Sequence, residues 1–240
     1  LCDRRQRQMC IRDRYNTDDD SLSGAEALIR WNSRKYGFIG PNTFIPLLED
    51  SALIIPLGRW IINTAAKACN RWITSIPDFV MHINLSFVQI VKSNIVKDVL
   101  ENIERYSAAN NHYVFEITET IEMDQIPAVQ NVFKEFVKND FRFAIDDFGT
   151  GYSNYGYMRD RTFDIVKVDR SFVTDIDKLK DNYLMVSFII KMAHEMGLHV
   201  CIEGVETKEE LSCVKKLGAD YIQGYYYGCL LYTSDAADDR

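Results

Sequence analysis

Acidic and amide side chains recur in this sequence where short runs of apolar, β-prone residues end. The set, with one lysine among it, is Glu26, Asn84, Glu116, Glu119, Asp146, Asp147, Lys167, Glu203, Glu206 and Gln223. Several carboxylates that meet in one place repel one another unless cations lie between them. Oxygen ligands from Glu, Asp and Asn suit hard cations such as Mg²⁺ or Mn²⁺. If the fold brings these residues together, the set predicts a divalent-cation site.

The adjacent pair Asp146-Asp147 narrows the chemistry. Neighbours on a strand point to opposite faces, so both can serve one site only where the strand passes into a loop. The glycine-rich run FGTGYS at 148–153 follows at once and permits this. Such a pair can bridge two metal ions about 3.5–4 Å apart, an arrangement that suits in-line attack on phosphorus. Taken alone, an Asp-Asp pair more often belongs to a turn or a helix cap.

The elements that must position these residues alternate between strand and helix. We expect strands at 25–31, 79–85, 113–117, 141–146, 163–168, 198–203 and 219–222, and helices at 56–72, 92–107, 125–139, 182–196 and 207–217. Repeated strand-helix units imply a parallel sheet. Seven strands favour a barrel, whose carboxyl-terminal strand ends form the active-site face. A complete barrel of this type needs eight strands, and the eighth is expected before residue 15.

Composition excludes several other classes of protein. Of the 240 residues, 47 % are hydrophobic and 26 % are charged, as in globular domains. No run of 18 apolar residues occurs, so no membrane segment is expected. The net charge of −7 argues against a nucleic-acid polymer as partner. Between residues 15 and 228 the cysteines are Cys69, Cys201 and Cys213, without a CxxC pair, which indicates a reducing, cytoplasmic compartment.

The two ends of the chain have an unusual relationship. Codons for the arginine-rich run RRQRQMCIRDR can be chosen so that the opposite DNA strand encodes CLLYTSDAAD, the run at 229–238. That DNA string resembles a transposase adapter used in shotgun library preparation. We therefore interpret residues 1–14 and 229–240 as adapter-derived and 15–228 as the domain. The alternative is a basic arm and an acidic tail. The barrel is then expected to lack its first strand and its carboxyl-terminal end, which leaves the strands at 25–31 and 219–222 with unpaired edges.

Seven ordered motifs resemble the EAL-domain cyclic di-GMP phosphodiesterases. They are EALIRW at 26–31, NLS at 84–86, EITE at 116–119, DDFGTGYS at 146–153, KVDRSFV at 167–173, EGVE at 203–206 and QGYYY at 223–227. The resemblance covers residues 24–228. It implies an α/β fold, a TIM-like (β/α)8 barrel of the EAL type with one antiparallel strand. It also implies hydrolysis of cyclic di-GMP to linear pGpG with two Mg²⁺ or Mn²⁺ ions, which lowers the level of this second messenger in bacterial signalling.

The resemblance assigns a role to each site residue. The implied metal ligands are Glu26, Asn84, Glu116 and Asp146 for one ion, and Asp146, Asp147 and Glu203 for the other. Lys167 is implied to orient the attacking water, with Glu203 as the alternative general base. The implied substrate-binding residues are Arg30, Glu206 and Gln223. Glu119 is implied to hold the 147–153 loop, which in this family couples dimerisation to metal binding.

Partners and rival functions follow from the same reading. The resemblance implies a homodimer and an upstream GGDEF or sensor domain, and the parent protein could be anchored in a membrane with this domain on the cytoplasmic side. One rival is a catalytically silent EAL domain that only binds cyclic di-GMP as a sensor. Another is an enolase-type barrel with one Mg²⁺ and a strand-end lysine as base. A purely structural barrel would leave the carboxylates unexplained. Turnover with Mn²⁺ separates the enzyme from the sensor.

Overall fold

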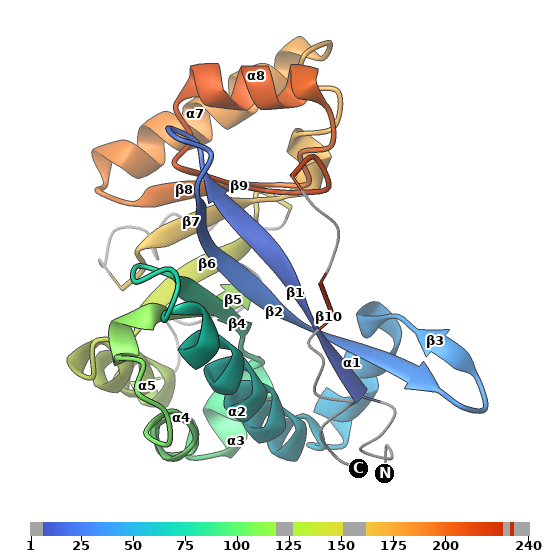
Figure 1. The fold of residues 1–240 in the computed structure, drawn as a ribbon, viewed down its shortest axis with the longest axis vertical. Helices are drawn as coiled ribbons and strands as arrows, with labels where there is room; N and C mark the ends of the chain where they lie inside the picture. Colours follow the sequence, from blue (N-terminus) through green and yellow to red (C-terminus); the bar gives the residue numbers. More distant parts are fainter. Residues whose placement is uncertain (1–6, 119–126, 151–161, 228–230, 233–240) are drawn as a thin grey trace.

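A computed structural model describes residues 7–118, 127–150, 162–227 and 231–232 (Figure 1). The strands are β1 (Arg7–Asn16), β2 (Leu22–Ser33), β3 (Gly37–Ile39), β4 (Val80–Asn84), β5 (Tyr113–Thr118), β6 (Arg142–Phe148), β7 (Ile165–Val168), β8 (His199–Glu203), β9 (Tyr221–Gln223) and β10 (Leu231–Tyr232). The α-helices are α1 (Pro41–Asp50), α2 (Ile54–Trp72), α3 (Phe87–Lys92), α4 (Ile95–Ile103), α5 (Pro127–Lys138), α7 (Lys180–Glu195) and α8 (Lys208–Leu217). Two short 3-10 turns are η2 (Asn110–His112) and η4 (Arg170–Phe172).

Eight of these strands close into a ring. The order β2, β4, β5, β6, β7, β8, β9 is parallel throughout, and β1 pairs antiparallel with both β9 and β2 to complete the circle. The helices lie outside the ring, with α7 and α8 beside β8 and β9 (Figure 1). The predicted (β/α)8 barrel with one antiparallel strand is confirmed, as are the seven strands and five helices expected from the sequence.

The expectation of a missing first strand is wrong for this structure. Residues Arg7–Asn16 form β1, so the edges of β2 and β9 that were expected to be unpaired are both paired. Strand β9 pairs with the end of β1, at Arg14–Asn16, and the short strand β10 pairs with its middle, at Cys10 and Ile11. Strand pairing uses main-chain groups, and Met9 and Ile11 supply apolar side chains at alternate positions, so this segment meets the physical requirements of a barrel strand.

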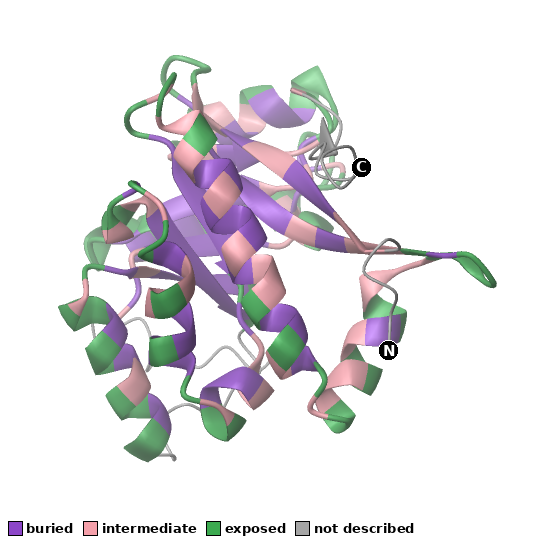
Figure 2. Cartoon of the chain, turned by 60° about the horizontal axis from the view of Figure 1, so that its bottom comes forward, coloured by how far each residue is buried: buried purple, intermediate pink, exposed green. Residues whose placement is uncertain are grey.

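Each strand has one face toward the barrel interior and one toward the helices. The outward-facing residues join the helices in the main apolar core, with Met81, Phe115 and Phe143 among the fully buried ones. A second, separate cluster fills the barrel near the start of the strands, and its members are Val80, Val114, Ala144, Ile165 and Cys201. Two residues further along each strand, the inward positions become polar. The apolar cluster is therefore the floor beneath the predicted site, and the buried strands appear in purple in Figure 2.

Other features of the helices follow from local rules. Helix α8 begins with a capping box formed by Thr207 and Glu210 and ends at Gly218, whose φ of 81° suits glycine. Helix α1, which we did not expect, contains Pro46 in its interior. In the part of the chain that the structure describes, no helix combines the length and the apolar character that crossing a bilayer requires.

Our first prediction tests whether β1 carries barrel stability. Ile11 is 3 % exposed and packs in the main core. Ile11→Ala should lower the free energy of unfolding by about 2–5 kcal/mol, the usual cost of removing a buried isoleucine side chain. Val137→Ala, at a position that is 49 % exposed, is the control. Urea unfolding of both variants is the measurement. An Ile11→Ala variant as stable as the wild type would show that residues 7–16 do not close the barrel in solution.

A second prediction concerns pH. Asp220 accepts hydrogen bonds from the Val200 amide at 2.7 Å and from the rings of His194 and His199 at 2.9 and 3.3 Å. Burial alone would raise the pKa of Asp220, but these hydrogen bonds lower it to about 2. The same contact with Asp220 raises the pKa of His199. The ionic pair is therefore complete only where Asp220 is ionised and His199 is protonated.

Asp220→Asn should cost about 1 kcal/mol of stability, since the pair is partly exposed to solvent. The difference from wild type should be largest at about pH 4–6 and shrink on both sides. It is lost toward pH 2 as Asp220 gains a proton, and lost at alkaline pH as His199 gives up its proton. Urea unfolding at pH 2.5, 5.5 and 8.5 checks this, and a difference that does not change with pH would contradict it.

Candidate active site

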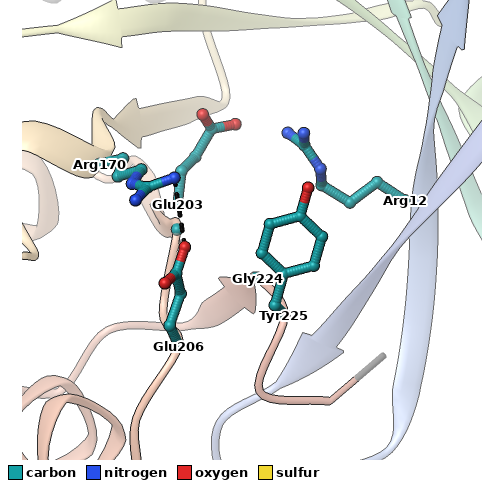
Figure 3. A pocket seen from close by; sticks show the side chains of 7 residues that line it. Arg12, Arg170, Glu203, Glu206, Gly224 and Tyr225 are labelled. Atoms are coloured by element: carbon teal, nitrogen blue, oxygen red, sulfur yellow. Dashed lines mark ion pairs between the residues drawn. The ribbon is translucent and has the colours of Figure 1, made fainter. Parts of the chain in front are cut away.

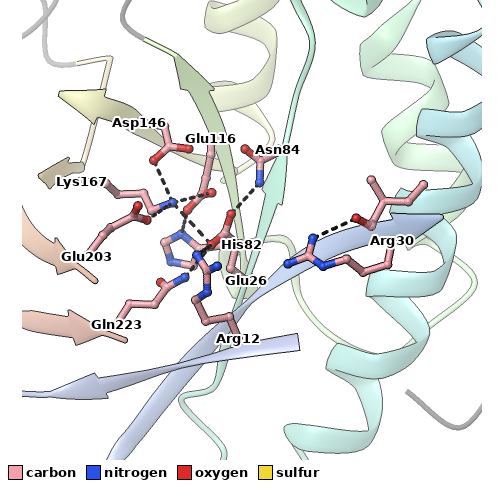
Figure 4. A network of polar contacts seen from close by, with 11 residues as sticks. Arg12, Glu26, Arg30, His82, Asn84, Glu116, Asp146, Lys167, Glu203 and Gln223 are labelled. Carbon is pink, nitrogen blue, oxygen red and sulfur yellow. Dashed lines mark hydrogen bonds and ion pairs between the residues drawn. The ribbon is translucent and has the colours of Figure 1, made fainter. Parts of the chain in front are cut away.

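The centre of the predicted site is the buried ammonium group of Lys167, on the inward face of β7. Its Nζ lies 2.7 Å from Glu203 Oε1 and 2.8 Å from Glu116 Oε2. It also lies 2.9 Å from Asp146 Oδ1 and 3.8 Å from Glu26 Oε2 (Figure 4). The lysine side chain is 1 % exposed. Four carboxylates from four different strands therefore converge on one cation inside the barrel.

These carboxylates fall into two groups that share one member. Oxygens of Glu26, Glu116 and Asp146 lie within 4.8 Å of one another, and so do oxygens of Asp146, Asp147 and Glu203. The carboxylates of the two ligand sets that the resemblance implies divide in the same way, with Asp146 in both groups. Ligand roles themselves stay predictions, since proximity alone does not assign them.

A bulge in β6 brings the neighbours Asp146 and Asp147 to the same side. We expected the strand to pass into a loop here, but both residues lie within β6. The register against β7 shifts between Ile145 and Phe148, and Asp147 has a φ of 54°, in the left-handed region. A bulge of this kind re-aims one side chain of an alternating pair. It therefore replaces the expected loop as the reason why two adjacent aspartates can serve one site.

Glu26 is held by two amide side chains. Asn84 Nδ2 donates to Glu26 Oε1 at 2.8 Å, and Gln223 Nε2 donates to Glu26 Oε2 at 2.5 Å. Arg12 Nη1 lies 3.7 Å from the same Oε2. Because the amide nitrogen of Asn84 faces Glu26, its carbonyl oxygen is left available as a ligand. Gln223, predicted to line the site, is 2 % exposed and fixes Glu26 instead of facing solvent.

Burial and mutual repulsion shift the pKa values of these carboxyl groups. Burial raises the pKa of Glu203 to about 7, with Lys167 opposing and Asp146 adding to the rise. Burial, then the charge of Asp146, raises the pKa of Asp147 to about 6. Burial also raises the pKa of Glu116 well above its usual value, against the effect of Lys167. For Lys167 burial acts in the opposite direction, but the four carboxylates outweigh it and raise its pKa well above the usual value.

The residues present fit hard divalent cations. Asp146 Oδ1 and Glu203 Oε1 are buried, and the described partner of each is the ammonium group of Lys167, at 2.9 and 2.7 Å. A carboxylate oxygen can accept two contacts, so each of these oxygens can bind a cation besides Lys167. The available donor atoms around them are oxygens, which Mg²⁺ and Mn²⁺ prefer.

A pocket of about 100 Å³ opens beside the carboxylates (Figure 3). Glu203 lines it together with Arg12, Arg170, Glu206 and Tyr225. Arg170 Nη1 lies 3.2 Å from Glu206 Oε1, so the predicted substrate-binding Glu206 forms an ion pair with the Arg170 guanidinium at the pocket wall. Two guanidinium groups near a carboxylate cluster can bind the phosphate of a ligand whose other atoms contact the cluster.

Two predicted residues are not placed with the cluster. Arg30 lies apart from the carboxylates along β2, and its Nη1 donates to the carbonyl oxygen of Ile29 at 2.9 Å (Figure 4). The structure therefore gives Arg30 no contact with the metal residues, and its role toward phosphate stays a prediction. Glu119 and residues 151–153 of the 147–153 loop lie outside the described residues.

Sequence reasoning missed His82, Arg12, Arg170 and Tyr225. His82 lies two residues before Asn84 on the same face of β4, so strand alternation alone could have placed it inside the barrel. Arg170 and Tyr225 belong to the motifs KVDRSFV and QGYYY but were not singled out in them. Arg12 lies in the segment interpreted as adapter-derived and was set aside for that reason.

Comparisons with known proteins agree with this arrangement. The family model described as EAL domain matches residues 3–229. The chain belongs to the EAL domain family. The match also includes most of residues 1–14, and the adapter origin of their codons stays a prediction that sequencing of the source DNA would test.

Individual EAL domains are similar over nearly the whole chain. The cyclic di-GMP phosphodiesterase PdeL of Escherichia coli is 32 % identical over 86 % of this chain and 57 % of its own length. A solved structure of the PaMucR phosphodiesterase in complex with c-di-GMP superposes with a TM-score of 0.88 at 29 % identity, covering 95 % of this chain and 93 % of that one. The EAL enzyme Bd1971, bound to cAMP and cyclic di-GMP, gives 0.87 at 32 % identity, covering 94 % and 62 %.

The chain spans only part of most relatives. It covers 26–30 % of the length of three curated proteins that are each 34 % identical to it. The activities and partners of those longer proteins can therefore only be proposed for this EAL domain.

The third prediction tests the central cation of this EAL domain. Lys167→Met should destabilise the metal-free protein by about 3 kcal/mol, because removing one partner of a buried ionic cluster leaves the other charges uncompensated. Added Mn²⁺ should recover part of the loss by supplying positive charge to the same carboxylates. Lys191→Met, on the exposed face of α7, is the matched control. Urea unfolding with EDTA and with Mn²⁺ is the measurement, and equal stability of the two variants in EDTA would contradict the prediction.

Proposed function

We propose that this EAL domain hydrolyses cyclic di-GMP to linear pGpG with two bound divalent cations, Mg²⁺ or Mn²⁺. The proposal rests on one observation: two sets of three carboxylate side chains lie at the carboxyl-terminal strand ends, and Asp146 belongs to both sets. The names of similar proteins support the substrate, since PdeL is named a cyclic di-GMP phosphodiesterase and the PaMucR structure is a c-di-GMP complex.

Each ion would be held by one of the two sets of carboxylate side chains. Glu26, Glu116 and Asp146, with the free oxygen of Asn84, would hold the first. Asp146, Asp147 and Glu203 would hold the second. When bound, such ions supply positive charge to the phosphate and lower the pKa of the attacking water.

The protein's own side chains would complete the chemistry. Water adds to one phosphorus, the bond from that phosphorus to the ribose 3′ oxygen breaks, and the leaving oxygen takes up a proton. Lys167, kept protonated by its carboxylates, would donate a hydrogen bond that orients the water. Glu203 touches both Lys167 and the pocket, so it can take the water's proton as well as bind a cation. Arg170 and Arg30 would bind the phosphate that is not cleaved.

The finer expectations from the resemblance belong to the same proposal. We propose a homodimer that acts downstream of a GGDEF or sensor domain, on the cytoplasmic side. The chain covers only 26–30 % of three curated relatives, so those relatives contain further sequence besides the matched region. MucR of Pseudomonas aeruginosa, 29 % identical over 94 % of this chain, is named a bifunctional diguanylate cyclase/cyclic di-GMP phosphodiesterase.

The fourth prediction tests the shared ligand. Asp146→Asn should lower hydrolysis of cyclic di-GMP at saturating Mn²⁺ about 10³-fold or more, because it removes the one charge that both sets of metal ligands share. Asp140→Asn is the control, since Asp140 is exposed and has a φ of 61° that asparagine tolerates. Chromatographic separation of pGpG from substrate gives the rate.

Two outcomes would count against the proposal. An Asp146→Asn variant with a near wild-type rate would remove the two-ion assignment. A wild-type chain that binds cyclic di-GMP but gives no pGpG with Mn²⁺ would identify a sensor instead of an enzyme.

A further inference from the structure

His82 is a buried polar side chain between the barrel floor and the carboxylates. It lies on the inward face of β4, two residues after Val80 in the apolar floor and two residues before Asn84 in the site. Its exposure is 2 %. A histidine in this middle layer is costly unless its ring nitrogens have partners, so its contacts indicate what it does.

The ring contacts a predicted metal ligand directly. His82 Nδ1 lies 2.7 Å from Glu116 Oε1, and the side chains are 2 % and 0 % exposed (Figure 4). The other oxygen of Glu116 accepts from Lys167 Nζ at 2.8 Å. Each oxygen of this carboxylate thus has one donor, and the two donors together fix the plane of the group.

The remaining nitrogen shows which tautomer is present. His82 Nε2 contacts the guanidinium of Arg14, a group that donates hydrogen bonds and accepts none. Nε2 must therefore be the accepting nitrogen, which places the ring proton on Nδ1. The His82 ring then donates that proton to Glu116, as the separation requires.

We propose that His82 is a positioning residue that orients Glu116 toward the first cation. The inference rests on the proposed function, because it needs Glu116 to be a metal ligand. Hydrogen bonds from residues behind the ligands hold them in the geometry that a cation requires, and their loss commonly weakens metal binding. His82 touches neither the pocket nor the substrate-binding residues, so its effect on the reaction passes through Glu116.

A pair of substitutions separates the hydrogen bond from packing. His82→Leu fills similar volume without a donor, whereas His82→Gln keeps an amide that can donate to Glu116. His112→Leu is the matched control, since it removes a ring hydrogen bond to the Phe79 carbonyl oxygen at 2.7 Å, outside the site. The measurements are Mn²⁺ affinity by calorimetry on the full chain, thermal unfolding in EDTA, and KM and kcat for cyclic di-GMP.

His82→Leu should bind Mn²⁺ about 10–100-fold more weakly, the usual range for such partners, while His82→Gln stays within about threefold of wild type. The loss should appear in kcat at fixed Mn²⁺ and recover as Mn²⁺ is raised, with KM for cyclic di-GMP unchanged. His112→Leu should bind Mn²⁺ as the wild type does.

Wild-type Mn²⁺ affinity in His82→Leu would overturn the role of His82 and leave the proposed function intact. Equal weakening in His82→Leu and His82→Gln, with equal loss of thermal stability, would also overturn it by assigning the effect to packing. A wild-type chain that binds no Mn²⁺ would remove the metal centre, and this proposal with it.

Discussion

The ion cluster around Lys167 is the interaction on which the rest of the site depends. Four carboxylates from β2, β5, β6 and β8 meet one ammonium group inside a barrel from which water is largely excluded. Charges at such short separation interact strongly at low dielectric, so carboxylates in this number are stable only with cations among them. Lys167 supplies one positive charge for four acidic groups. The remaining excess of negative charge is what makes the site suited to divalent cations, and through them to a phosphate.

Closure of the barrel makes this concentration of charge possible. The contributing strands lie around most of the ring, so no pair of neighbouring strands could build the site. Glu26 on β2 and Gln223 on β9 are separated by β1 in the sheet, yet they are hydrogen-bonded inside the barrel. Opening the ring at β1 would therefore disturb Glu26, which contacts Lys167, Asn84 and Gln223. Stability and chemistry are linked at this point of the fold, because the same strand that removes the sheet edges also keeps Glu26 in place.

Sequence reasoning reached the strands and most of the carboxylates because both follow from local patterns. Apolar runs of strand length, each followed by a helix, predict the parallel ring, and residues at the ends of its strands must meet. Three features required knowledge beyond such patterns. The bulge that turns Asp147 depends on the register with β7. His82 resembles any core histidine until its partner on the neighbouring strand is known. The position of Arg30 away from the cluster depends on the path of β2 beyond the ring, where it pairs with β3.

The first strand was not predicted because its residues were set aside as adapter-derived, and its place in the ring has a physical explanation. A barrel strand between two partners needs main-chain donors and acceptors, no interrupting proline, and apolar side chains at the positions that face the helices. The segment 7–16 meets these conditions with Met9 and Ile11. Strand β1 supplies none of the ion cluster itself, since the four carboxylates and Lys167 all lie between residues 26 and 203. From β1, Arg12 approaches Glu26 at 3.7 Å, and Arg14 contacts the His82 nitrogen that does not face Glu116. The proposed reaction therefore depends on β1 first as the strand that closes the ring, and then on the contacts of Arg12 with Glu26 and of Arg14 with His82.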